Sequence, residues 1–154
     1  MAEERIEGME RRMVHRLLMH WRAARGDEGI PSLEAVFQQP CDGCEPFIYV
    51  LGVGDVGEEP EFERIGEFFA DELPSDLTGK PVSAVPEGTL LERAVRYYGD
   101  ILKKKVPMTL GGEFVHARGD TILYRSIILP LSGREGVIDH LMGAANYKVK
   151  EGDA

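Results

Sequence analysis

Hydrophobic and polar positions along the C-terminal third of the chain predict a three-stranded meander, with its middle strand at residues 121–131. This segment contains two interleaved sets of side chains, both apolar towards its end: Leu123, Arg125, Ile127 and Leu129, and Ile122, Tyr124, Ser126 and Ile128. Successive side chains of a strand point to opposite faces, so both faces of this strand are expected to be covered. The flanking strands are predicted at residues 108–117 and 137–149.

A long amphipathic helix is predicted near the N-terminus, from Glu4 to Ala24. Its apolar residues recur at intervals of three and four, and they are Ile6, Met9, Met13, Val14, Leu17, Leu18 and Trp21. Such a stripe needs a partner, which is the outer face of the same sheet, a second copy of the chain, or both. The contact residues are expected to be Met13, Val14, Leu17, Leu18 and Trp21. A helix lying on a membrane surface is disfavoured, because its acidic residues would repel anionic lipid.

The segment between residues 30 and 73 predicts two strands and two short helical pieces. Ser32 is expected to cap a short helix that reaches Gln38. The apolar run Phe47–Val53 predicts a buried strand, and the polar residues 54–60 connect it to the next strand. That second strand is expected to end at about Gly66, before a helical turn over residues 67–73.

A second long helix is predicted from Thr89 to about Lys105. Thr89 and Glu92 have the spacing of a capping box, in which each side chain accepts the other's backbone N–H. Gly99 interrupts this helix, at a cost of about 1 kcal/mol relative to Ala. The basic run 103–105 suits the negative end of the helix dipole better than a phosphate. The pair Gly111–Gly112 is expected to mark a β-bulge.

Composition narrows the class of protein. The chain has 154 residues, 43% of them hydrophobic and 29% charged, which indicates one globular domain. No apolar run approaches the roughly 18 to 20 residues that cross a bilayer, and no signal peptide is recognised, so a cytoplasmic protein is expected. The net charge of −9 argues against nucleic-acid binding, which requires a basic surface.

The order of elements resembles a PAS domain, the small sensory fold of bacterial signalling proteins. The similarity is carried by residues 62–73 followed by Leu77-Thr-Gly-Lys-Pro81, where the second PAS strand enters the first helix. Further short motifs resemble a family of stand-alone bacterial PAS-like proteins of uncharacterised role: His20-Trp-Arg22, Ile30-Pro-Ser32, Leu77-Thr-Gly79 and Ile128-Leu-Pro-Leu131. The likeness covers nearly the whole chain, apart from residues 41–44.

This resemblance implies an α+β fold with a five-stranded antiparallel sheet and helices inserted between strands two and three. One sheet face and the central helices would form a cup, and the N-terminal helix would cover the opposite face. Residues 1–28 would form the sheet-capping or dimerisation helix, 29–150 the PAS-like domain and 151–154 a tail. Candidates for a ligand cavity in the cup are Phe68, Phe69, Leu90, Ala94, Leu110, Phe114 and Arg125.

Several of these residues have alternative interpretations. Arg125 would hold an anionic ligand if it faced the cup, or pair with an acid of the N-terminal helix if it faced outward. The apolar candidates are also ordinary core residues. His116 and His140 would ligate haem only if they pointed into the cavity, and otherwise they are satisfied or solvent-facing histidines.

The two cysteines form the motif Cys41-Asp42-Gly43-Cys44. This spacing fits a dithiol redox pair, half of a metal site, or two thiols in a turn. A single pair does not complete a tetrahedral zinc site, and no histidine lies at a finger-like spacing, so no metal site is predicted.

No catalytic constellation or phosphate-binding glycine loop is recognised. Together with this absence, the resemblance to PAS domains implies a non-enzymatic sensory domain, expected to be a homodimer that binds a small ligand, a signalling partner or both. The alternative is a thiol redox module that uses Cys41 and Cys44. No cofactor is identified.

Overall fold

The computed structural model describes residues 2–25, 29–41, 43–55, 57–133 and 137–150, with side chains described from Arg12 onward. The chain begins with the long helix α1 (Ala2–Arg25) and the short helix α2 (Leu33–Phe37). After the 3-10 turn η1 (Glu45–Phe47) come strands β1 (Ile48–Gly52) and β2 (Glu61–Ile65). The inserted segment follows, and its elements are η2 (Glu67–Glu72), η3 (Val82–Ala84), α3 (Leu90–Val95) and α4 (Tyr98–Lys104). Strands β3 (Met108–Val115), β4 (Thr121–Leu131) and β5 (His140–Val149) complete the fold.

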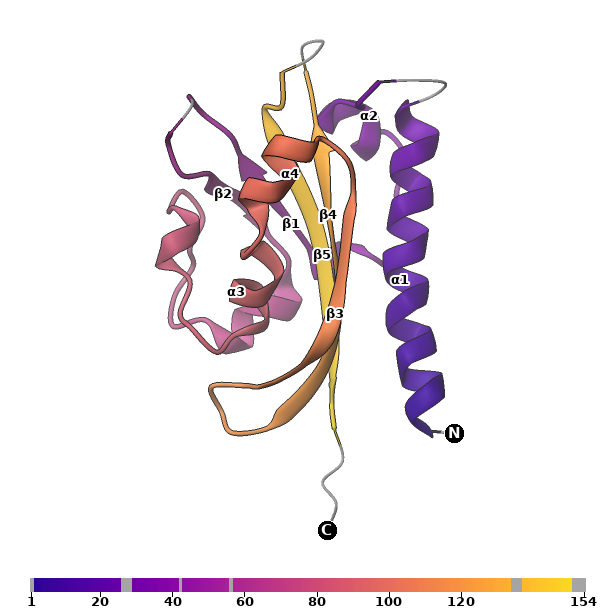
Figure 1. Ribbon diagram of the computed structural model, residues 1–154, viewed down its shortest axis with the longest axis vertical. Coiled ribbons are helices and arrows are strands. Elements are labelled where there is room, and N and C mark those ends of the chain that lie inside the picture. Colours follow the sequence, from indigo (N-terminus) through magenta and orange to yellow (C-terminus); the bar gives the residue numbers. More distant parts are fainter. Residues whose placement is uncertain (1, 26–28, 42, 56, 134–136, 151–154) are drawn as a thin grey trace.

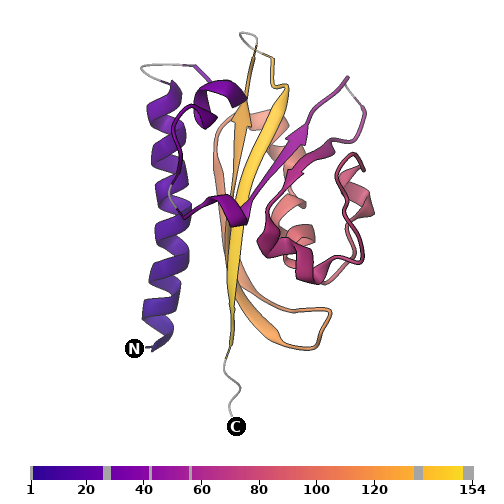
Figure 2. The same ribbon diagram turned by 180° about the vertical axis from the view of Figure 1, so that it is seen from behind.

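The five strands form one antiparallel sheet in the order β2-β1-β5-β4-β3. Consecutive strands β3, β4 and β5 make the predicted meander, and β1 pairs with the free side of β5. Figures 1 and 2 show α1 and α2 on one side of this sheet and α3 and α4 on the other. The predicted α+β architecture, with helices inserted between the second and third strands, is confirmed.

The outer face of the sheet, which α1 covers, carries alternate residues of β4. Ile127, Leu129 and Leu131 are fully buried there with Met142 and Ala144 of β5. The helix contributes Met13, Val14, Leu17 and Trp21 to the same cluster, with Leu18 packed at its margin. The indole Nε1 of Trp21 donates to the carbonyl of Pro130 at 2.9 Å. The described part of the helix stripe is therefore buried on the outer face of its own sheet, the first of the three arrangements predicted for it.

The inner face carries the other set of β4 side chains, including Ile122, Tyr124 and Ile128. They pack with residues of β1, β3 and β5 against the inserted helices, in a separate cluster that contains Leu90, Leu91 and Ile101. Both faces of β4 are thus covered by elements of the same chain. Each fully buried Leu, Ile or Phe side chain stabilises the fold by about 1.5–3 kcal/mol relative to the same side chain exposed to water.

Local sequence signals predict the N-terminal caps of two helices correctly. The Ser32 hydroxyl accepts from the backbone N–H of Ala35 at 3.0 Å and caps α2. The Thr89 hydroxyl accepts from the N–H of Glu92 at 3.2 Å and caps α3. The Glu92 carboxylate is engaged by the guanidinium of Arg96, at 2.7 and 2.9 Å, so the reciprocal half of the predicted capping box is replaced by an i,i+4 ion pair.

The prediction of one continuous helix from Thr89 to Lys105 is wrong, because the chain forms two helices, α3 and α4, over these residues. The break falls at Tyr97, whose φ of −102° and ψ of 27° lie outside the helical range, whereas Gly99 lies inside the first turn of α4. In an unbroken helix, the carbonyl of Ala94 would accept from the N–H four residues later. Here it accepts the hydroxyl of Tyr49 instead, as described below.

The bulge predicted at Gly111–Gly112 is also wrong. Strands β3 and β4 pair without interruption from Met108 opposite Ile128 to Val115 opposite Thr121. A Cβ at position 111 would lie 2.7 Å from Nη1 of Arg125, so this glycine makes room for the arginine that crosses it. The register shift lies elsewhere, between Val50 and Leu51 in the pairing of β1 with β2.

Within the described residues, no helix is both long and apolar enough to cross a membrane. The predicted boundary at residue 28 and the tail at 151–154 fall outside the described residues, so the division into segments stays a prediction. The structure does place residues 12–25 against β4 and β5.

Replacing Leu17 by Ala is expected to lower the free energy of unfolding by about 2–5 kcal/mol, because Leu17 is fully buried between α1 and the sheet. Met19→Ala on the same helix is the matched control, since Met19 is 47% exposed, and it should change stability by less than about 0.5 kcal/mol. Urea denaturation of both variants checks this. Equal, small effects would show that the helix is not packed on the sheet.

Candidate functional site

The six apolar residues predicted for the cup all belong to the inner-face cluster. Phe69, Leu90 and Ala94 are fully buried, Phe114 is buried, and Phe68 and Leu110 are partly buried against the same cluster. Their rings and chains pack on each other and on neighbours. The Phe114 ring lies 5.6 Å from that of Tyr124, and the guanidinium of Arg93 lies 4.8 Å over it. The structure brings these six residues together as packed core, and a ligand-lining role for them stays a prediction.

Tyr49 belongs to the same inner-face cluster as the cup candidates. It is fully buried on the inner face of β1, and its hydroxyl donates to the carbonyl of Ala94 in α3 at 3.2 Å. Its strand partner across β5 is Gly143, where any Cβ would overlap the tyrosine ring. Burial raises the pKa of Tyr49 far above its ordinary value. The side chain therefore links the sheet to α3 and packs in the cluster between them.

Glu72 caps the N-terminus of α3 from the end of η2. Its two carboxylate oxygens accept from the backbone N–H groups of Leu90 and Leu91, at 2.8 and 2.9 Å. The side chain is only 5% exposed. A buried carboxylate is stabilised by such donors and by the positive end of the helix dipole. This contact fixes the start of α3 to the preceding segment.

His116 completes this buried polar group from the end of β3. Its Nε2 lies 2.9 Å from Oε1 of Glu72, and its side chain is 1% exposed. Its Nδ1 accepts the backbone N–H of Arg118 at 3.1 Å. Because Nδ1 is the acceptor, Nε2 carries the hydrogen that faces the carboxylate. Both ring nitrogens are occupied, so His116 is a satisfied buried histidine and has no free nitrogen for haem.

His140 is held by two carboxylates at the outer face. Its Nε2 lies 3.0 Å from Glu63 and its Nδ1 lies 3.0 Å from Asp139. The bulge in β2 explains the first contact, because it places both Glu63 and Arg64 on the outer face while Ile65 stays on the inner face. Both ring nitrogens of His140 therefore have carboxylate partners, and its side chain does not point into the cup.

The placement of Arg125 corrects the sequence-based assignment to the cup. It alternates with Ile127 and Leu129, which lie under α1, so its side chain lies on the outer face. Its strand neighbours are Gly111, which it crosses, and Asn146. An ion pair with Glu3, Glu4, Glu7 or Glu10 would involve side chains outside the described residues.

Described cavities lie away from the cup candidates. One groove of about 790 Å³ runs along the β1–β2 connection and is lined by Glu58, Glu59, Glu61, Glu63, Asp139 and His140 among others. Another, of about 460 Å³, lies between η3 and the α3–α4 break.

Within the described part of the chain, no group of three or more His, Cys, Asp or Glu side chains is arranged to hold a metal ion. Cys41 and Cys44 are joined by a disulfide.

Sequence reasoning missed Tyr49, Glu72 and Glu63 as structural anchors. Their partners are 45, 18 and 77 residues away, so no local spacing could reveal them. A weak signal existed for Tyr49, because a tyrosine inside the apolar run 47–53 requires a partner for its hydroxyl when buried. The buried partner of His116, Glu72, is 44 residues away and has no local signal in the sequence either.

Replacing Tyr49 by Phe is expected to destabilise the protein by about 1–2 kcal/mol at neutral pH, because the Ala94 carbonyl then loses its buried donor. Since the pKa of Tyr49 is raised on folding, the protonated hydroxyl favours the folded state, and this stability is present below about pH 10. Above that value the native chain should lose about 1.4 kcal/mol per pH unit from this residue, and the variant should not. Urea denaturation near pH 7 and about pH 11 tests both effects. Tyr97→Phe, at a 41% exposed position, serves as the control, and identical behaviour of the two variants would contradict the prediction.

Replacing Glu72 by Gln should cost about 2–3 kcal/mol, because one carboxamide oxygen cannot accept from three N–H donors and its NH₂ group would face one of them. Glu92→Gln makes the same chemical change at the first turn of α3, in a carboxylate that pairs with the exposed Arg96, and should cost less than about 0.5 kcal/mol. Urea denaturation midpoints of the two variants and the wild-type chain measure both losses of stability. A Glu92 effect as large as that of Glu72 would contradict the assigned role of Glu72.

No protein-family model matches the sequence, and no curated protein matches it. Among solved structures, a variant of the protein RsLOV is 13% identical, over 90% of this chain and 71% of that chain, with a TM-score of 0.50. The light state of the blue-light photoreceptor Aureochrome1 LOV is 16% identical over 70% of this chain and 84% of that chain, with a TM-score of 0.48. The PAS domain of an HTR-like protein from Haloarcula marismortui is 16% identical over 75% and 88%, with a TM-score of 0.43. Similarity at such low sequence identity concerns the fold alone. The similarity to RsLOV and the strand order β2-β1-β5-β4-β3 together show that this chain has the fold of the PAS-domain superfamily.

Proposed function

We propose that this chain is a non-enzymatic sensory or regulatory domain that acts by binding a signalling partner, a small ligand or both. The observation that carries the proposal is the PAS-superfamily fold with a long helix packed across the outer face of its sheet. Helices on both faces contact the same strands, so a change on one face has a direct physical path to the other. The narrower placement among stand-alone bacterial PAS-like proteins belongs to this proposal.

Ligand binding in the cup would require a rearrangement of the inner core. Tyr49 lies between the sheet and α3, and its hydroxyl is bonded to Ala94. A ligand among Phe68, Phe69, Leu90, Ala94, Leu110 and Phe114 would have to displace this side chain. The packing therefore favours a partner protein as the first signal or the output, with a ligand restricted to a state in which Tyr49 has moved. No cofactor is assigned.

Dimerisation remains part of the proposal, but its surface differs from the first expectation. Met13, Val14, Leu17 and Trp21 are buried against the sheet, so these residues are not available for a second copy while α1 is docked. A homodimer would use other surfaces or exchange this helix between copies. The acidic chain, with a net charge of −9, favours a partner surface with basic character. A cytoplasmic location is part of the same proposal.

A second candidate function is a thiol redox module, because Cys41 and Cys44 are within bonding distance of each other. Proximity alone supplies no redox chemistry. What distinguishes the two functions is whether the oxidation state of this pair changes anything that a partner could recognise.

Native mass spectrometry of the freshly purified chain, with its absorption spectrum, tests the sensor proposal. We expect a dimer at twice the mass of one chain, with no bound small molecule and no visible chromophore, because the cup is filled. A stable monomer that captures no partner and turns over a small substrate would contradict a non-enzymatic regulatory role. Added mass or colour would contradict the filled cup, and it would identify the ligand.

A further inference from the structure

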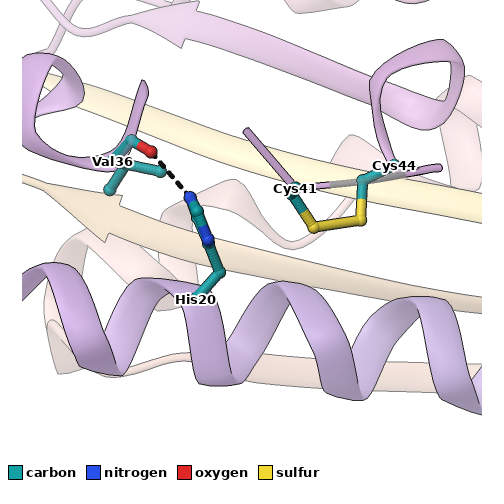
Figure 3. The surroundings of a disulfide bond; sticks show 4 residues. All are labelled: His20, Val36, Cys41 and Cys44. Carbon is teal, nitrogen blue, oxygen red and sulfur yellow. Dashed lines mark hydrogen bonds between the residues drawn. A yellow bond between two sulfur atoms is a disulfide. The ribbon is translucent and has the colours of Figure 1, made fainter. Parts of the chain in front are cut away.

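The disulfide between Cys41 and Cys44 lies under α1, at the point where the chain enters the sheet. The two Cα atoms are 5.5 Å apart, and the N–H of Cys44 donates to the carbonyl of Cys41 at 3.0 Å. Both cysteines belong to the outer-face cluster with Met13, Val14 and Leu17. Figure 3 shows the pair beside α1, near His20, whose Nε2 lies 2.7 Å from the carbonyl of Val36 in α2.

The two cysteines differ in their access to small molecules. Cys44 is fully buried, whereas Cys41 is 9% exposed. Cys41 also lines a cavity of about 120 Å³ whose wall includes His20, Glu45 and Met142. Cys44 is not among the residues that line this cavity. A cavity of this volume has room for a small polar reagent.

We propose that Cys41 is a thiol–disulfide exchange site for small aliphatic thiols, with Cys44 as the leaving and resolving sulfur. Exchange depends on which sulfur can be reached, since the attacking thiolate must approach in line with the bond that breaks. The cavity opens to Cys41. Cys44 is fully buried and does not line this cavity.

The chemistry balances as an ordinary exchange. The thiolate of the incoming thiol forms a bond to Sγ of Cys41, the Cys41–Cys44 bond breaks, and its electron pair leaves on Cys44, which then takes up a proton. A second thiol attacks the mixed disulfide, releases Cys41 as a thiol and departs as the small-molecule disulfide. The protein disulfide is reduced to two thiols, and two small thiols are oxidised to one disulfide. In reverse, Cys44 attacks a mixed disulfide on Cys41 and expels the small thiol.

Exchange at this position acts on the docking of α1. Two unbonded thiols require more room than one disulfide, and a mixed disulfide places a further group in the cavity. Protein interiors are close-packed, so extra volume beneath Leu17 and Met13 weakens the contact between α1 and the sheet. The oxidation state of the pair would thereby control the outer face of the domain. This inference rests on the second candidate function, the thiol redox module, and it does not depend on the sensor role.

The first experiment compares two single variants of the full-length chain. Cys44→Ser leaves Cys41 as a free thiol, and Cys41→Ser leaves Cys44. Each folded variant is treated with the small disulfide of 2-mercaptoethanol, and the mixed disulfide is followed by intact mass. We expect the Cys44→Ser variant to react at least ten-fold faster. Equal rates, or faster reaction of Cys44, would overturn the assignment of Cys41 as the exchange site.

The second experiment uses the wild-type chain, so it does not depend on how the variants fold. Trp21 is the single tryptophan, 3% exposed, and it lies on the docked face of α1. Reduction by 2-mercaptoethanol should shift its fluorescence to longer wavelength and increase quenching by acrylamide. The double variant Cys41→Ser/Cys44→Ser should not respond to the thiol. A wild-type signal that is unchanged after complete reduction, verified by mass, would overturn the coupling to α1.

Discussion

The structure depends on one constraint, which is that strand β4 is apolar on both faces. Ile127, Leu129 and Leu131 require cover on one side, and Ile122 and Ile128 require it on the other. A five-stranded sheet with helices on only one side would leave an exposed apolar face, which soluble monomers avoid. The chain resolves this with α1 outside and the segment between β2 and β3 inside. The N-terminal helix is thus part of the fold and not an appended segment.

The inserted helices are held to the sheet by two polar anchors in addition to apolar packing. Tyr49 joins β1 to the end of α3, and Glu72 joins η2 and His116 to its beginning. Buried polar contacts of this kind specify one arrangement, because a displaced helix would leave donors and acceptors unsatisfied. Any signal that enters or leaves the inner core must therefore break or move one of these anchors.

The sequence permitted accurate prediction where the determining interactions are local. Ser32 and Thr89 cap helices a few residues away, and the amphipathic period of α1 is evident from its own residues. The five-stranded antiparallel sheet and the position of the inserted helices followed from the resemblance of the chain to PAS domains, whereas the order of the strands came only from the structure. The outer-face position of Arg125 could not be predicted, since it depends on which set of β4 residues faces α1, and both sets are apolar near the strand's end.

Long-range contacts account for the remaining differences. The helix break at Tyr97 accompanies the hydroxyl of Tyr49, which takes the Ala94 carbonyl from 45 positions away. Gly111 pairs with Arg125 without a bulge. Its lack of a side chain leaves room for the Arg125 side chain, which crosses it from the neighbouring strand. The six apolar cup residues lie in or against one cluster, yet the sequence could not indicate that Tyr49 packs in the same cluster and bonds to Ala94.

Native-state amide hydrogen exchange tests most directly whether α1 belongs to the cooperative fold. Residues 13–21 of α1 and the central residues of β4 should exchange with similar free energies of opening, close to the global free energy of unfolding. This result would follow from the shared burial of Leu17, Trp21, Ile127 and Leu129. Fast exchange of residues 13–21 while β4 stays protected would contradict the account, because the sheet would then be stable without its outer helix.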